Sequence, residues 1–138
     1  MAALVLDASV AVAWFMPEEL NPILRSVGEQ VSDEGAAVPN LWPLEVANIL
    51  LRAEGTKRIS KQYRAEAIGE LARLRIEIDT ETAMRAWDTT LDLASHFRLT
   101  TYDACYLELA QRRRLPLATL DRELRAAGGK LGIELLGA

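Results

Sequence analysis

The sequence has few of the residues that redox, membrane or histidine-based chemistry requires. It contains one cysteine, Cys105, one histidine, His96, and no apolar run near the roughly 20 residues that span a bilayer. A lone cysteine forms no intramolecular disulfide, so we expect a reducing, cytoplasmic setting. One histidine excludes a two-histidine ribonuclease mechanism, and its place in the helical pattern LDLASHFRLT, far from the acids described below, argues against a Ser-His-Asp triad. Cys105 has no evident base beside it and is expected in the core.

A net positive charge is also absent. The formal net charge is −4, from 16 basic and 20 acidic residues, which at first argues against a nucleic-acid partner. The two signs alternate along the chain, because residues 1–50 and 76–111 are mostly acidic whereas residues 51–75 and 112–138 are mostly basic. Such blocks are ordinarily solvated helix faces, but they also suit an acidic pocket with an arginine rim that holds a polyanion.

The remaining composition is that of a globular protein, with 50% hydrophobic and 26% charged residues, and the length suits a single domain over residues 1–138. Expected strands alternate with expected helices, which predicts a three-layer α/β/α fold with a central, mostly parallel sheet. The expected strands are residues 3–6, 36–38, 76–78, 117–119 and 133–136. The expected helices are residues 9–15, 18–33, 43–54, 60–74, 81–97, 101–113 and 121–127, the last of them ended by the Gly128-Gly129 pair.

Four carboxylates occur where parallel sheets place their active sites, at the carboxyl ends of strands. Asp7 directly follows the first strand, within the otherwise apolar or small stretch ALVLDASVAVAWF, and Asp121 follows the strand PLATL. Glu45 and Asp103 lie in the first turns of two expected helices. Helix capping or the helix dipole explains any one of these acids. However, Asp7 and Asp103 lie in apolar sequence, where a plain solvent-exposed cap would have polar neighbours.

Three stretches of the chain resemble the PIN domain family, and in particular the toxins of VapBC toxin–antitoxin pairs: LVLDASVAVAWF, PLEVANILLRAE and LTTYDACYLELAQRRRLPLATLDRELRAAG. The resemblance implies a PIN-like fold and a Mg²⁺- or Mn²⁺-dependent endoribonuclease. It implies a homodimer, and an antitoxin that wraps the toxin and blocks its pocket. An exposed apolar surface near the first helices would suit that partner. The family's four acids correspond to Asp7, Glu45, Asp103 and Asp121, and its supporting hydroxyl residues to Ser9 and Thr119.

Carboxylate oxygens are hard ligands that suit Mg²⁺ or Mn²⁺. Our hypothesis is that Asp7 and Asp103 hold a divalent ion, directly or through water, and that Asp121 and Glu45 complete the site. Water activated by the ion would then hydrolyse an RNA phosphodiester. Basic residues at the rim would contact phosphates without selecting sequence. The candidates are Arg52, Lys57, Arg58, Lys61, Arg112, Arg113 and Arg114. For the last three, a place at a helix end also suits the helix dipole alone.

Other classes of protein fit the sequence less well or remain open. A phosphatase of the haloacid dehalogenase type needs a second acid two residues after the first, and Ser9 occupies that position. A receiver domain needs an acidic pair near the first strand and a lysine near the last. This chain has only Asp7 near the first strand and only three lysines, Lys57, Lys61 and Lys130. Two alternatives stay open: a PIN-domain nuclease of RNA processing that is not a toxin, and a non-catalytic α/β interaction module whose acids are only caps.

Overall fold

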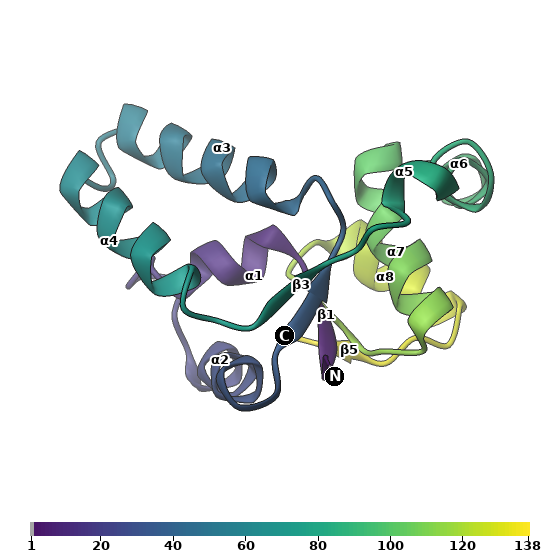
Figure 1. Cartoon of the computed structure of the whole chain (residues 1–138), viewed down its shortest axis with the longest axis horizontal. Helices are drawn as coiled ribbons and strands as arrows, with labels where there is room; N and C mark the ends of the chain where they lie inside the picture. The colour runs from purple at the N-terminus through teal and green to yellow at the C-terminus, as the bar shows by residue number, and fades with distance from the viewer. Residues whose placement is uncertain (1) are drawn as a thin grey trace.

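The computed structural model describes residues 2–138 and contains one five-stranded sheet in which every paired strand runs parallel (Figure 1). The spatial order is β3-β2-β1-β4-β5. The strands are β1 (Leu4–Leu6), β2 (Ala36–Val38), β3 (Ile76–Ile78), β4 (Leu117–Ala118) and β5 (Leu135–Leu136). Short buried apolar runs such as LVL and AAV are typical of central strands covered on both faces. The predicted parallel sheet is therefore confirmed.

Helices cover the sheet on both faces, which confirms the three-layer prediction (Figure 1). One layer holds α1 (Ala8–Ala13), α2 (Pro22–Glu34), α3 (Trp42–Gly55) and α4 (Lys61–Leu71). The other holds α5 (Thr82–Arg85), α6 (Thr89–Phe97), α7 (Thr101–Arg113) and α8 (Arg122–Lys130). Across residues 2–138, none of these helices has the length and hydrophobicity that crossing a bilayer requires.

The core lies on both faces of the sheet, and on one face α7 packs against the central strands β1 and β4. Every residue of α7 from Ala104 to Ala110 is buried, so this helix is surrounded by protein over its middle turns. Cys105 lies in this segment, as expected, and Tyr106 and Leu107 have no exposed surface. Each buried aliphatic side chain of this kind contributes about 1.5–3 kcal/mol. The core therefore fixes α7, and with it the residues at both of its ends.

Several expected helix boundaries are wrong, among them the ends of α1 and α4, which stop at Ala13 and Leu71. The single helix expected over residues 81–97 is divided into α5 and α6, because Asp88 adopts a non-helical conformation with φ −118° and ψ −108°. No glycine or proline marks this break. Helix α8, expected to end before Gly128-Gly129, continues to Lys130. A Cβ atom on Gly128 would lie 2.9 Å from Leu135 Cδ2, so this glycine allows α8 to approach β5 closely and does not end the helix.

The start of α2 also differs from the expectation, since the helix begins at Pro22 and not at residue 18. The side chain of Asn21 accepts a hydrogen bond from the Leu24 N–H at 3.0 Å. Asparagine at the cap followed by proline at the first helical position is a strong helix start. Residues 17–20 therefore belong to the connection between α1 and α2.

The strand order creates a switch in topology beside β1. The chain runs from β1 to β2 and β3 on one side, and then returns to place β4 on the other side of β1. In open parallel sheets, ligands bind at such a switch, outside the carboxyl ends of the strands. The residues that follow β1 and β4, which include Asp7 and Asp121, lie there.

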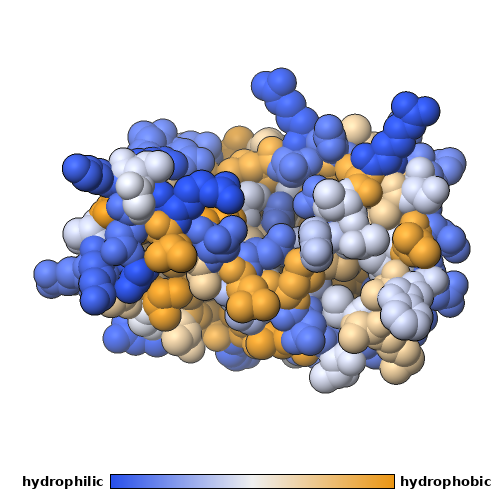
Figure 2. Space-filling model, turned by 90° about the horizontal axis from the view of Figure 1, so that it is seen from above, coloured by the Kyte–Doolittle hydropathy of each residue, from blue (hydrophilic) through white to orange (hydrophobic). Residues whose placement is uncertain are grey.

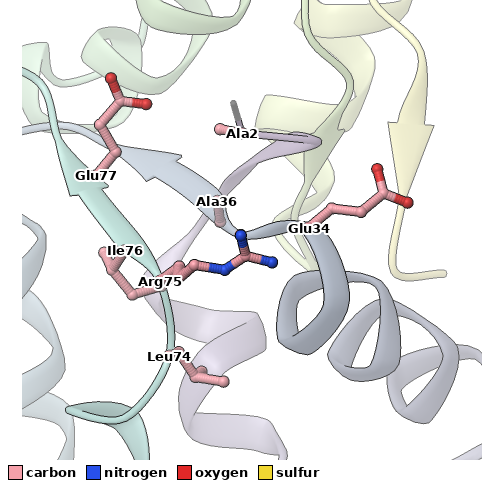
Figure 3. A pocket seen from close by; sticks show the side chains of 8 residues that line it. Ala2, Glu34, Ala36, Leu74, Arg75, Ile76 and Glu77 are labelled. Carbon is pink, nitrogen blue, oxygen red and sulfur yellow. The ribbon is translucent and has the colours of Figure 1, made fainter.

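A separate cavity of about 350 Å³ lies at the opposite edge of the sheet, where β2 and β3 begin (Figure 3). Gly35 has φ +82°, and a Cβ atom there would lie 2.8 Å from the Arg75 carbonyl oxygen, so the turn requires glycine. The Arg75 guanidinium donates a hydrogen bond to the Asp33 carbonyl oxygen. Figure 3 shows the carboxylates of Glu34 and Glu77 pointing away from one another. Among the described residues that line this cavity, the polar groups do not converge as those of a binding site do.

Candidate active site

All four predicted acids line one cavity of about 420 Å³ at the carboxyl ends of the strands. Asp7 follows β1, and Glu45 lies in the first turn of α3. Asp103 lies in the first turn of α7, and Asp121 precedes α8. The fold thus brings together side chains from four separate segments of the chain.

Asp7 is buried, with 8% of its surface exposed, and its side chain does not cap the helix that follows. Its Oδ2 atom accepts hydrogen bonds from the Ser9 hydroxyl at 2.9 Å and the Thr119 hydroxyl at 2.7 Å. Burial raises the pKa of Asp7 above its usual range; the two hydroxyls oppose this shift, and the charge of Asp121 adds to it. Ser9 and Thr119, which the resemblance implies as supporting residues, therefore both contact Asp7.

Asp121 caps a helix and also lies at the cavity. Its Oδ1 atom accepts a hydrogen bond from the Leu124 N–H at 2.9 Å. Its own N–H donates to the Thr119 hydroxyl at 3.0 Å. Because that hydroxyl also donates to Asp7, one threonine side chain fixes two of the acids. A carboxylate offers two oxygens, so a capping role for Oδ1 is compatible with a ligand role for the group.

The Asp103 carboxylate is not needed as a cap. The Thr100 hydroxyl caps α7 by accepting a hydrogen bond from the Asp103 N–H at 3.1 Å. Burial raises the pKa of Asp103, and the negative charges of Asp121 and Asp7 raise it further. Carboxylates that shift one another's pKa in this way repel one another, which an added cation would relieve.

Glu45 is half-buried and is held by a residue that the sequence analysis missed. The Tyr106 hydroxyl donates a hydrogen bond to Glu45 Oε1 at 2.5 Å. Burial raises the pKa of Glu45, the Tyr106 hydrogen bond opposes this, and the charges of Asp7 and Asp103 add to it. The sequence does contain a signal for Tyr106, because a tyrosine in a helix segment rich in apolar residues needs a partner for its hydroxyl.

Little positive charge compensates these acids. Among the described residues that line the cavity, the one basic side chain is Arg58. It lies at the surface and pairs with two other acids, Glu18 and Glu19. Arg52, which the sequence analysis favoured, lies in the last turn of α3 and is exposed, outside the cavity lining.

The structure corrects the expected placement of Arg112. Asp103 lies in the first turn of α7 and Arg112 in the last, nine residues later, so the two positions are about 14 Å apart along the helix axis. The Arg112 guanidinium lies 2.8 Å from Asp79 and 2.7 Å from Glu108, and its side chain is 17% exposed. It also lies 3.4 Å from Glu81. Its charge is therefore compensated inside the protein and does not lie at the rim of the acidic cavity.

The other two arginines of this run also lie outside the cavity. Arg113 pairs with Glu77 at 3.1 Å. Arg114 lines a different cavity, together with Leu115 and Pro116 near the start of β4. With Arg52, they stay predictions for RNA contact.

The chemistry of the acids fits a hard divalent cation. Within residues 2–138, no three acidic, histidine or cysteine side chains are arranged to hold an ion together. Mg²⁺ needs no such group, because proteins bind it through one or two carboxylates while it keeps several waters. Four carboxylates line one cavity, three of them with raised pKa values, so oxygen donors and uncompensated negative charge are both present there.

Comparisons with known proteins agree with this architecture. The model of the PIN domain family matches residues 4–130. The chain is similar to PAE2754 from Pyrobaculum aerophilum, with a TM-score of 0.63 and 21% identity over 91% of this chain and 84% of that one. It is similar to FitAcB from Neisseria gonorrhoeae, with a TM-score of 0.62 and 16% identity over 97% and 96% of the two chains.

A third similar structure is a toxin-antitoxin complex from Klebsiella pneumoniae, with a TM-score of 0.59 and 16% identity over 86% of each chain. At these identities, the likeness to the solved structures shows the fold alone. No curated protein sequence matches the chain.

Proposed function

The chain belongs to the PIN domain family, and from that premise we propose that it is a metal-dependent endoribonuclease, the toxin of a toxin–antitoxin pair. The observation that carries the proposal is the cavity, where four carboxylates from four segments meet with little compensating charge. Buried charges in proteins are ordinarily paired or bind metals. Among the described residues, neither the buried Asp7 nor the three partly buried acids form an ion pair with a basic side chain. The Klebsiella pneumoniae complex supports the toxin role, since a similar fold is found there in a toxin-antitoxin assembly.

Asp7, Glu45, Asp103 and Asp121 would hold Mg²⁺ or Mn²⁺. When bound, such an ion supplies Lewis-acid chemistry: it lowers the pKa of water and stabilises negative charge that develops on a phosphate. The chain's own part is to hold these acids in place. Ser9 and Thr119 donate to Asp7, and the N–H of Leu124 fixes Asp121. Side chains fixed in this way need little rearrangement when substrate binds.

We assign RNA positioning to basic residues near the cavity. Arg58 lies in the cavity lining, where exchange of its exposed carboxylate partners for an RNA phosphate would keep its charge compensated. Arg52 lies later in the helix that carries Glu45. Contacts of this kind fix the register of RNA and do not read its sequence. The proposal includes a single PIN domain over residues 1–138 and a cytoplasmic location.

The proposal also includes a homodimer and a bound antitoxin, and an exposed apolar face supports protein partners. Figure 2 shows several hydrophobic groups, interspersed with hydrophilic ones, on the side of the molecule that bears α3, α5 and α6. Trp87 is 93% exposed, Leu44 76% and Tyr102 65%. The surface expected near the first helices is less apolar, because Trp14 is partly buried and donates to the Leu24 carbonyl oxygen. Exposed aromatic residues are typical of interfaces.

We place the second copy on this face. An apolar cavity of about 330 Å³ lies beside Leu44 and Tyr102, and Thr90 lines it with a hydroxyl that is buried and, among the described residues, without a hydrogen-bond partner. Light scattering of the pure chain should give a dimer mass, and Trp87→Ser should shift it to a monomer. A wild-type monomer would remove the homodimer from the proposal, and the cavity of acids would be unaffected.

Cleavage of total RNA tests the nuclease directly. We expect discrete fragments from the wild-type chain with Mg²⁺ or Mn²⁺, none with EDTA, and none from Asp7→Asn. Asp92→Asn, the same chemical change at an exposed acid of α6, is the control and should cleave normally. A folded, metal-loaded wild type that cleaves no RNA would favour the interaction module instead. Growth arrest on expression without antitoxin would separate a toxin from an RNA-processing nuclease.

A further inference from the structure

The side chain of Tyr106 has no exposed surface, yet its hydroxyl reaches two acid-bearing segments of the site. It donates to Glu45 Oε1, at 2.5 Å, and accepts from the N–H of Ala8, at 3.4 Å. Ala8 directly follows Asp7, and Tyr106 lies one turn after Asp103 on α7. One buried phenol therefore joins the segments that carry three of the four acids.

We propose that Tyr106 is a positioning residue that holds the Glu45 carboxylate in the orientation in which it binds a divalent cation. This inference rests on the metal-dependent function proposed above. A glutamate side chain has several rotatable bonds, and a ligand that must be ordered on binding loses affinity. The Tyr106 ring lies in the core, so its hydroxyl is a fixed point from which Glu45 is oriented. Groups that orient metal ligands by hydrogen bonds typically change metal affinity by 10–100-fold.

The direction of the hydrogen bonds agrees with this role. An ionised carboxylate only accepts, so the Tyr106 hydroxyl is the donor to Glu45. The phenol oxygen keeps lone pairs, one of which accepts the Ala8 N–H. Burial raises the pKa of the Tyr106 hydroxyl, and the charges of Asp7 and Glu45 raise it further, so the donor proton is retained. Among the contacts of residues 2–138, no protein donor occupies Glu45 Oε2, which leaves that oxygen for a ligand.

The chain contains a matched control for this hydroxyl. Tyr63, on α4, donates to the Phe15 carbonyl oxygen at 2.7 Å and is partly buried, whereas Tyr106 is fully buried. It lies outside the lining of the acidic cavity. Tyr63→Phe and Tyr106→Phe each remove one oxygen atom and one hydrogen bond. Only the second change touches an acid of the site.

The test is the affinity for Mn²⁺ alone, measured by titration calorimetry, with the Tm of each variant in EDTA as a check on folding. We expect Tyr106→Phe to weaken Mn²⁺ binding about 10-fold or more. Tyr63→Phe should change the affinity less than twofold while it lowers Tm by a similar amount. If both variants bind Mn²⁺ as tightly as the wild type, Tyr106 is only a core residue and the inference is wrong.

A double variant tests whether Tyr106 acts through Glu45. Glu45→Gln alone should weaken Mn²⁺ binding, and adding Tyr106→Phe to it should weaken binding no further. A full additional 10-fold loss in the double variant would show that Tyr106 acts by another route, against the inference. The double variant also keeps the proposal testable if Tyr106→Phe lowers Tm. A loss of Mn²⁺ affinity caused only by a weaker fold would be the same with and without Glu45→Gln.

Mn²⁺ binding and RNA cleavage by the wild-type chain distinguish a failure of this inference from a failure of the proposed function. A wild type that binds no Mn²⁺ and cleaves no RNA overturns both. A wild type that binds Mn²⁺ and cleaves RNA, beside a Tyr106→Phe variant that does both equally well, overturns only the role of Tyr106.

Discussion

The molecule contains two groups of carboxylates, each with at least one buried member, that are alike in sequence and opposite in electrostatics. The cavity acids are Asp7, Glu45, Asp103 and Asp121. The Arg112 cluster consists of Arg112 with Asp79, Glu81 and Glu108. Asp7 follows β1 directly and Asp79 follows β3 directly, and the two are 8% and 7% exposed.

The pKa values of these two aspartates move in opposite directions. Burial raises the pKa of Asp7, and its hydroxyl partners do not overcome that effect. Burial acts to raise the pKa of Asp79 as well, but hydrogen bonds from Arg112 and Thr82, with the charge of Arg112, bring it below the usual range. A buried acid after a strand is therefore not enough to mark a site. The missing counter-charge is what distinguishes the cavity acids.

The largest expected effect is on activity at the cavity. Asp7→Asn keeps the shape of the side chain and removes its charge, so we expect RNA cleavage to fall about 1000-fold or more. That loss corresponds to about 4 kcal/mol, in line with the several kcal/mol that metal catalysis contributes. Single-turnover cleavage under saturating Mn²⁺ measures it. Asp79→Asn, the same change in the Arg112 cluster, should keep activity wherever the variant is folded; a comparable loss there would break the comparison.

The next effect is on stability, and it belongs to the Arg112 cluster. Arg112→Met leaves Asp79 and Glu108 buried without their counter-charge and should cost about 3 kcal/mol of unfolding free energy. Urea denaturation gives the value. Adding Asp79→Asn and Glu108→Gln to that variant should recover much of the loss, because no buried charge then remains unpaired. If the triple variant is no more stable than Arg112→Met, packing and not charge explains the effect.

Added Mn²⁺ should also distinguish the cavity acids from the Arg112 cluster, through a change in stability of similar size. At 100 times its dissociation constant, Mn²⁺ should stabilise the wild type by about 2.7 kcal/mol, seen as a higher Tm. Arg112→Met should start from a lower Tm and gain the same increment. Asp7→Asn should lose most of the gain. An equal gain in Asp7→Asn would mean that Mn²⁺ binds somewhere other than the cavity.

The smallest effect is on the pH dependence of stability without metal. Asp7 has a raised pKa in the folded state, so its contribution to stability is greatest below the ordinary value of 3.8 and falls as pH rises through the folded pKa. Asp7→Asn should therefore gain stability relative to the wild type as pH rises above about 4.

Asp79 has a lowered pKa, so the sign is reversed. Its contribution is present above its ordinary value of 3.8 and is lost as pH falls through the folded pKa. The deficit of Asp79→Asn against the wild type should shrink below about pH 4. Denaturation curves in EDTA at several pH values measure both; slopes of the same sign would contradict the contrast.

Local patterns were sufficient to predict most of the fold. The runs LVL and AAV predicted the strands β1 and β2, because short apolar runs between turn or helix-start residues are typical of buried parallel strands. The division between α5 and α6 was missed because neither glycine nor proline occurs at it. The end of α8 was misplaced because Gly128 lies inside the helix, where the lack of a side chain leaves room for Leu135 of β5.

The candidate site was predictable to a similar extent. The four acids follow strands or begin helices, and each of those features is local. Tyr106 was missed because its partner, Glu45, lies on a helix far away in sequence. Arg112 was misplaced because a run of arginines at the end of a helix does not show which acids face it.

The sequence by itself therefore determined the order of strands and helices, the carboxylates at their ends, and the family to which the chain belongs. Only the tertiary structure decided which of those carboxylates have a counter-charge. The physical reason is that strand ends and helix starts depend on neighbouring residues, whereas charge compensation acts over a few ångströms between residues that are distant along the chain. Asp7 and Asp79 look alike in sequence, and the position of Arg112 makes them different.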